Sequence, residues 1–251
     1  MKDKIFEYLL RIADDRLILG HRLSEWCAHA PILEEDIALA NIGLDCIGQA
    51  KFLYEAAAEL EGNNRTADDI VYFREATEYK NILLVEQPNG DFAQTIVRQF
   101  LYDSFGILLF DKLQECSFLP LAGIAQKAIK EIRYHFRHSS QWLIRLGDGT
   151  EESHQRTQQA LSNLWKYTDE MFLSDDLEQI LSEQGITVRS SLLKEKWFQI
   201  VSDVILKATL IIPESGVIVH KGGREGKHTE HLGHLLAEMQ IVARSFPEIQ
   251  W

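Results

Sequence analysis

The stretch Lys130-Glu131-Ile132-Arg133-Tyr134-His135 lies in the middle of a long helix that the sequence predicts over residues 123–146. Apolar or small side chains recur along this helix in steps of three or four, at Leu121, Ala125, Ala128, Ile132, Ser139, Trp142 and Leu146. This spacing is typical of a helix that faces the core of a bundle. His135 falls on the same stripe, so we expect it to point inward.

An inward-facing histidine in a four-helix core is a feature of carboxylate-bridged di-iron sites, where it belongs to a Glu-x-x-His pair. Here Ile132 stands three residues before His135, at the position where the pair needs Glu. The sequence therefore leaves two hypotheses, a di-iron protein or a bundle of the same kind that cannot hold the iron pair.

The composition favours a helical domain with a large core. The chain has 251 residues, of which 45% are hydrophobic, and it contains only 5 prolines and 15 glycines. Long periodic runs lie between these helix breakers, so an all-α fold is expected. The formal net charge of −12 argues against a nucleic-acid partner, because phosphate binding needs clustered Lys and Arg.

The sequence shows no sign of export or membrane insertion. Cys27, Cys46 and Cys116 are odd in number and lack metal-ligand spacing, as is usual for reduced thiols in the cytoplasm. Charged residues occupy the N-terminus, where a secretion signal needs an uncharged run. No apolar run reaches the length of a membrane span. We therefore expect a cytoplasmic protein without a membrane partner.

Four long helices are predicted to form the bundle, over residues 3–28, 34–60, 92–117 and 123–146, with Asp91 as the N-cap of the third. The polar turn at Gly147 marks the end of this bundle (residues 1–147). Residues 148–251 should add helices packed on it, within one domain of residues 1–251. Shorter helices are expected at 67–81, at 190–210 and through Val242, and Ser174 is expected to cap one that ends at Gly185.

Aligning the inward faces of the four bundle helices gives six candidate ligand positions, Arg16, Asp45, Gly48, Asp103, Ile132 and His135. A di-iron bundle needs a Glu from each of two helices and a Glu-x-x-His from each of the other two. A cation, a glycine and an isoleucine occupy three of these positions, so too few ligands remain for an iron pair. We therefore expect no metal, no cofactor and no catalytic residue in this chain.

Arg16 has two interpretations. At the edge of its stripe, it would extend its guanidinium into solvent. If buried, it needs a carboxylate partner, because an unpaired buried charge is costly, and Asp45 or Asp103 could supply one. The alternative for Asp45 is a solvated or capping carboxylate.

Two further patterns lie near the C-terminus. His228, His231 and His234 have three-residue spacing, which suggests either a zinc site or histidines at a helix start and on the surface; the outer two are about 120° apart on a helix. The run Lys221-Gly222-Gly223-Arg224-Glu225-Gly226-Lys227 resembles a phosphate loop but lacks the first glycine and the hydroxyl residue of a Walker A motif. The interpretation of this run as a basic loop that contacts a phosphate or an acidic partner is left open.

Several runs spread over nearly the whole chain carry a resemblance to a known family. They are Arg22-Leu23-Ser24-Glu25-Trp26-Cys27, His29-Ala30-Pro31, Ala38-Leu39-Ala40-Asn41-Ile42-Gly43-Leu44-Asp45, Leu83-Leu84-Val85-Glu86-Gln87-Pro88-Asn89-Gly90, Lys130-Glu131 with Tyr134-His135, His228-Thr229-Glu230-His231-Leu232-Gly233, and Leu236-Ala237-Glu238-Met239-Gln240. In these runs the sequence resembles the C subunits of the bacterial multicomponent oxygenase that epoxidises the ring of phenylacetyl-CoA.

The resemblance implies a ferritin-like four-helix bundle with additional C-terminal helices. It also implies a structural, non-catalytic role in aerobic phenylacetate degradation, beside a related A subunit that carries the di-iron centre. No activity is expected for the chain alone. Two alternatives from other classes are a stand-alone di-iron oxidase or hydroxylase and a helical adaptor unrelated to oxygenation.

The isolated chain is expected to form a homodimer through the helix face that the catalytic subunit otherwise covers. Segment 34–60 is apolar on more than one side, and large apolar patches are seldom left exposed on a monomer. Symmetric dimers are the commonest outcome of such exposure.

Overall fold

A computed structural model of the chain describes residues 1–214, 220–247 and 249. These described residues form ten α-helices and four short 3-10 helices, with no β-strand among them. The prediction of an all-α fold built on a helical bundle is confirmed.

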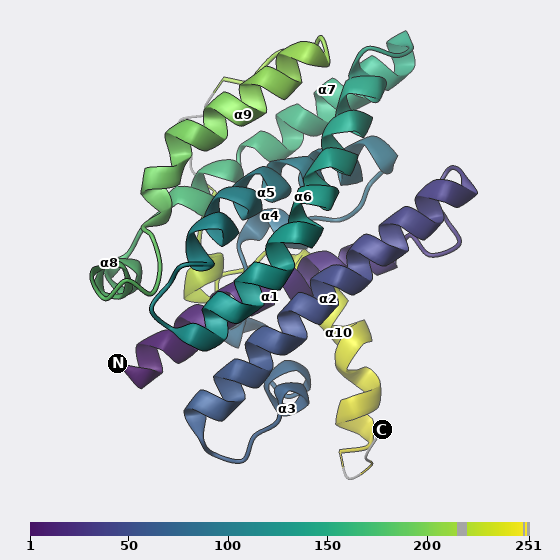
Figure 1. Cartoon of the computed structure of the whole chain (residues 1–251). Coiled ribbons are helices and arrows are strands. Elements are labelled where there is room, and N and C mark those ends of the chain that lie inside the picture. Colours follow the sequence, from purple (N-terminus) through teal and green to yellow (C-terminus); the bar gives the residue numbers. More distant parts are fainter. Residues whose placement is uncertain (215–219, 248, 250–251) are drawn as a thin grey trace.

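Two helical hairpins form the bundle. The first consists of α1 (Lys2–Ser24) and α2 (Leu33–Glu61), and the second of α5 (Phe92–Leu113) and α6 (Leu119–Gly147). Contacts between α2 and α6 join the two hairpins, and Figure 1 shows the four long helices through the middle of the molecule. Close approach within the first hairpin depends on Gly20, since a Cβ there would lie 2.8 Å from Ile47 and 3.0 Å from the carbonyl oxygen of Gly43.

Local chemistry sets the helix ends. The Asp91 carboxylate accepts the Gln94 N–H at 2.9 Å, which confirms the predicted N-cap of α5. The helix α6 begins at Leu119 rather than at residue 123, because Pro120 fits the first turn. The helix α1 ends at Ser24 rather than at residue 28, and α5 ends at Leu113 rather than at residue 117. The reason is that the residues after each of these helices form hydrogen-bonded turns.

Aromatic residues fix the end of the bundle near these turns. The Trp26 indole donates to the Thr95 hydroxyl at 3.0 Å. The Phe92 ring makes edge-to-face contacts with Trp26 and Trp142, at centroid distances of 6.0 and 5.1 Å, a favoured aromatic geometry. The end of α1, the start of α5 and the end of α6 are therefore held together.

A further layer follows in the sequence, with α7 (Glu151–Trp165), α8 (Asp176–Glu183) and α9 (Lys194–Lys207). The helices α7 and α9 pack on α5 and α6, and α8 packs on α1 (Figure 1). Ser174 is not the cap of α8, because the Asp175 carboxylate accepts the Glu178 N–H at 3.0 Å instead. The division between residues 1–147 and 148–251 stays a prediction.

The remaining α-helices are α3 (Ala67–Tyr72), α4 (Leu83–Glu86) and α10 (Glu230–Ser245). The four 3-10 helices are Ala76–Glu78, Thr168–Phe172, Ser190–Leu193 and Gly223–Glu225. The predicted helix over residues 67–81 is wrong beyond Tyr72. Arg74 turns inward there, its guanidinium Nη1 lying 3.0 Å from the Asp14 carboxylate, and residues Tyr79 and Ile82 have extended backbone angles. Within the described ranges, no helix has the length and apolar character needed to cross a bilayer.

Candidate functional site

The bundle centre holds a fully buried arginine. Arg16 of α1 is 0% exposed, so the interpretation in which it reaches solvent is wrong. Its guanidinium carbon lies 4.9 Å from the centroid of the Tyr102 ring and 4.8 Å from that of Phe110. Cations over aromatic faces in desolvated places are attracted by the ring quadrupole. Gly106 leaves the room for this group, since a Cβ there would lie 2.7 Å from Nη2 of Arg16.

Arg16 makes no direct ion pair within the described part of the chain, and its three guanidinium nitrogens have no hydrogen-bond partner there. The predicted salt bridge to Asp45 or Asp103 is therefore wrong as a contact. The reason is that both carboxylates have other donors. Asp103 accepts from the Gln99 amide at 2.8 Å and from the Ser139 hydroxyl at 3.1 Å.

The charge of Arg16 affects the pKa of the buried Asp103 carboxyl group without a direct contact. Burial raises the pKa of Asp103 to about 6, although the nearby His135 and Arg16 and the two hydrogen bonds act in the opposite direction. Burial therefore dominates the pKa of this carboxyl group.

The structure places Asp45 and His135 beside this centre. Nε2 of His135 lies 3.0 Å from the Asp45 carboxylate, whose side chain is 38% exposed while His135 is buried. Asp45 is thus at the edge of the core rather than inside it. Gly48 lies elsewhere, because a Cβ built on it meets nothing within 4 Å. Its assignment to the inward face is wrong, and Cys46 and Gln49 are the buried residues of this part of α2.

These positions do not fit an iron pair. Ile132 is fully buried next to Gly106 and offers no donor atom. Arg16 brings a positive charge into the bundle centre, and a positive charge repels metal cations. Over the described ranges, no three His, Cys, Asp or Glu side chains are grouped so that they could hold a metal ion. The structure brings Arg16, Asp103 and Ile132 together, with His135 and Asp45 beside them and Gly48 apart.

A second polar cluster was not predicted. It consists of four buried carboxylates, Asp14, Asp15, Glu86 and Glu170. They accept hydrogen bonds from segment 79–86, to which Glu86 itself belongs, and from loop 221–229. We call this cluster the clasp. Asp14 receives hydrogen bonds from the Arg74 guanidinium, the Tyr54 hydroxyl and the Lys80 backbone N–H, the last at 2.7 Å. A buried charge with this many donors is stabilised.

The other carboxylates hold backbone groups in the same way. Asp15 accepts the N–H of Ile82 at 2.8 Å, and Glu170 accepts those of Leu83 at 2.6 Å, Gly222 at 2.8 Å and Gly223 at 2.9 Å. Arg224 donates to both oxygens of Asp15, at 3.0 and 2.8 Å. Loop 221–227 therefore binds two carboxylates of its own chain, Asp15 and Glu170, which replaces the interpretation of this run as a phosphate loop.

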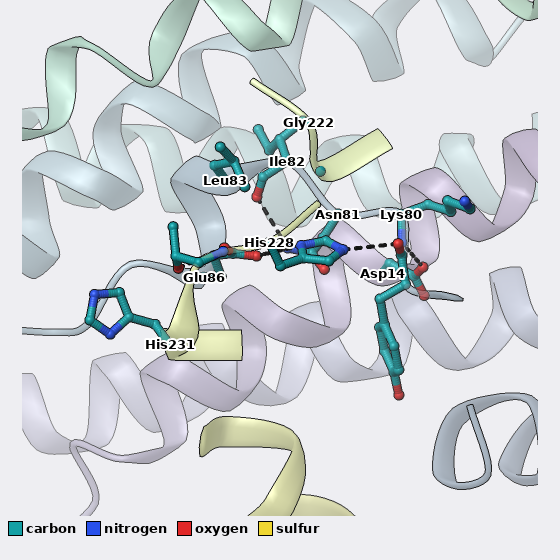
Figure 2. Close-up of polar contacts among 12 residues, drawn as sticks. Asp14, Lys80, Asn81, Ile82, Leu83, Glu86, Gly222, His228 and His231 are labelled. Atoms are coloured by element: carbon teal, nitrogen blue, oxygen red, sulfur yellow. Dashed lines mark hydrogen bonds and ion pairs between the residues drawn. The ribbon is translucent and has the colours of Figure 1, made fainter. Parts of the chain in front are cut away.

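His228 links the loop to Glu86. Its Nδ1 lies 2.8 Å from the Glu86 carboxylate and its Nε2 lies 3.0 Å from the carbonyl oxygen of Tyr79. Figure 2 shows the ring between Glu86 and segment 80–83. Because both partners are acceptors, both ring nitrogens donate and the imidazole is charged. Burial lowers the pKa of His228, but the hydrogen bond and charge of Glu86 outweigh it, so that this pKa lies above its ordinary value of 6.5.

The zinc hypothesis does not fit this geometry. Both His228 nitrogens are bound to protein acceptors, and a zinc ligand needs a free ring nitrogen. His234 is exposed, and His231 lies away from His228 in Figure 2. The sequence signal for the clasp was the adjacent pair Asp14-Asp15 in an apolar helix, together with the glycines of loop 221–227.

The fold and the two polar clusters define a helical-bundle protein whose centre holds polar residues but not the ligands of an iron pair. Comparisons with known proteins identify the family of this chain. The model of the family described as "Phenylacetic acid catabolic protein" matches residues 1–251, and the chain belongs to this family. It is 47% identical over 249 residues to the C subunit of the 1,2-phenylacetyl-CoA epoxidase of Escherichia coli (strain K12), covering 99% of this chain and 100% of that protein.

The environment of Arg16 predicts that two substitutions lower the stability of the protein by different amounts. Arg16→Ala should lower the free energy of unfolding by about 3 kcal/mol, because it leaves a cavity between two aromatic rings. Arg16→Met keeps most of the buried stem and removes a charge without a direct partner, so its cost should be below about 1 kcal/mol. Urea unfolding of both variants measures this. Equal losses would mean that the charge itself stabilises the core, and an Arg16→Ala loss under about 0.5 kcal/mol would contradict burial.

The clasp predicts a strict need for glycine at one position. A Cβ on Gly223 would lie 2.0 Å from the carbonyl oxygen of Asn81, so Gly223→Ala should cost about 2 kcal/mol or more. Gly233 of α10 is the matched control, since its Cβ would meet nothing within 4 Å and Gly233→Ala should stabilise the helix by about 0.5–1 kcal/mol. Thermal unfolding compares the two; a neutral Gly223→Ala would show that the loop packs less closely than this distance implies.

The charged His228 predicts a pH-dependent contribution to stability. Because its folded pKa is raised above 6.5, the contribution is fully present below the unfolded pKa and is lost as the pH rises through the folded pKa. The difference in unfolding free energy between wild type and His228→Gln should therefore be larger at acidic than at alkaline pH. The exposed His234, replaced in the same way, should show no such trend. A difference that grows with pH would contradict the charged state.

Proposed function

We propose that this chain is a structural, non-catalytic subunit of a multicomponent phenylacetyl-CoA epoxidase, acting beside a di-iron catalytic subunit in phenylacetate catabolism. The full-length similarity to a protein named as the C subunit of that epoxidase carries the proposal. Membership of the phenylacetic acid catabolic protein family supports the assignment of the chain to phenylacetate catabolism. The reaction then belongs to the assembly, and the partner subunit supplies the iron centre.

The bundle centre supports the non-catalytic part of the proposal. Chemistry on O₂ at a di-iron centre needs several ionised carboxylates that bridge two metal ions. Here the buried Arg16 and Ile132 occupy the space between the helices, and neither offers a ligand for a metal cation. These residues favour a packed, metal-free centre over a stand-alone oxidase.

The proposal predicts two measurements on the purified chain and its complex. After expression in iron-rich medium, metal analysis should find far less than two irons per chain, with the catalytic subunit from the same preparation as the positive control. Phenylacetyl-CoA turnover should require the catalytic and reductase components and should collapse when this chain is omitted. Stoichiometric iron in this chain, or full turnover without it, would contradict the proposed role.

In isolation, the chain should form a homodimer. Five side chains of α2 and α6 that are apolar and exposed, Leu33, Ile37, Leu44, Phe52 and Tyr134, support self-association. Light scattering at micromolar concentration measures the mass, and a monomer alone would contradict this proposal.

A further inference from the structure

The guanidinium group of Arg16 carries hydrogen-bond donors that no protein acceptor meets. The side chain is fully buried, and its Nε, Nη1 and Nη2 atoms find no hydrogen-bond partner in the described part of the chain. The rings of Tyr102 and Phe110 attract the charge, but a ring face accepts hydrogen bonds only weakly. Buried donors in proteins are nearly always paired, either with protein atoms or with ordered water.

Acceptors with free capacity lie on α5 in the same part of the bundle. Gln99, Asp103 and Gly106 follow one another in steps of four and three, so they share one side of this helix. The guanidinium lies at Gly106, where a Cβ would be 2.7 Å from Nη2 of Arg16. Each oxygen of Asp103 accepts one hydrogen bond and has a lone pair left for a second. Oε1 of Gln99 accepts none from the described residues.

The spacing of these groups suits one water molecule. Gly106 and Asp103 are three residues apart on α5, a rise of about 4.5 Å. Two hydrogen bonds of about 2.8 Å that meet at one bent water molecule also span about 4.5 Å. Arg16 and Asp103 form no direct ion pair. After burial, which is the largest influence on the pKa of each group, the charge of the other is among the further influences.

We infer that an internal water molecule bridges Arg16 and Asp103. Its oxygen accepts from the guanidinium, and its two hydrogens are donated to the Asp103 carboxylate and to Oε1 of Gln99. Three hydrogen bonds are the usual number for a buried water. Arg16 and Asp103 then form a solvent-separated ion pair in the bundle centre. This inference goes beyond the proposed function and does not depend on it.

The balance of charge favours water over a small anion at this site. Besides burial, the influences on the pKa of Arg16 include two carboxyl groups, Asp103 and Asp15. Asp15 is already paired with Arg224, at 2.8 Å, so Asp103 is the carboxylate left to balance Arg16. An added anion would meet the charge of Asp103 in a buried place, where like charges repel strongly. A neutral water satisfies the donors without adding charge.

A high-resolution crystal structure of the wild-type chain, from crystals soaked in sodium bromide, tests the inference directly. We expect an ordered water oxygen within hydrogen-bond distance of a guanidinium nitrogen of Arg16 and of a carboxylate oxygen of Asp103, without anomalous signal. Anomalous signal from bromide at Arg16 would show an anion site instead. That result, a direct contact between the two side chains, or no ordered density between them would each overturn the inference.

Urea unfolding of variants tests the pair in solution. Arg16→Met and Asp103→Asn are made singly and together. Because Asp103→Asn removes the charge that the water links to Arg16, the loss of Arg16 should then matter less. The factor by which Arg16→Met raises the unfolding equilibrium constant should be at least about threefold smaller in the Asp103→Asn background than in the wild type.

Arg98 provides the matched control. It is also fully buried, and it donates to the carbonyl oxygen of Gln87 and to the side chain of Asn89. Burial and the charges of Arg22 and Glu25 set the direction of its pKa shift, and Asp103 is not among the causes. The effects of Arg98→Met and Asp103→Asn should therefore multiply to within about twofold.

Two results of the unfolding experiment would contradict the pair. Independent effects of Arg16→Met and Asp103→Asn would show that the two groups are not linked. Equal coupling in the Arg98 control would show that the coupling is a general response of the core. If a variant does not fold, the wild-type crystal structure decides the question alone.

Discussion

The need of a buried carboxylate for hydrogen-bond donors organises the connections between the helices. Asp14, Asp15, Glu86 and Glu170 are almost completely excluded from solvent, and a charge in that position is tolerated only with several donors. Segment 79–86 and loop 221–229 supply them, largely from backbone N–H groups that no helix uses. The first hairpin, the outer layer and the start of α10 are thereby bound to segment 79–86, half of which is the short helix α4.

A related requirement shapes the bundle centre. Asp103 is buried there, and burial raises its pKa to about 6 against the opposing effects of Arg16 and its hydrogen bonds. A di-iron protein would place metal cations among its inward carboxylates. In this chain an arginine brings positive charge to the same region from α1, held between Tyr102 and Phe110. Ile132, whose side chain has no donor atom, is fully buried in the same part of the bundle.

The sequence predicted the four bundle helices because their apolar periodicity is long and unbroken, and it predicted the Asp91 cap because the turn before it is distinctive. It could not choose the inward side of α2, since Gly48 and Leu44 belong to a pattern that is apolar on two sides. The clasp could not be predicted from the sequence for another reason. Asp15 and Arg224 are 209 positions apart, and no local pattern indicates which of two adjacent aspartates binds which distant loop.

The error on α2 has a physical cause. A helix in a four-helix bundle needs one apolar side, and α2 satisfies that need with Ile42, Cys46 and Leu53, all fully buried. On the second side Leu44 is 66% exposed. Because both sides carry the period of a bundle helix, the pattern alone does not show which of them enters the core. The packing of α2 against α1 and α6 decides it, and those contacts join residues far apart in the sequence.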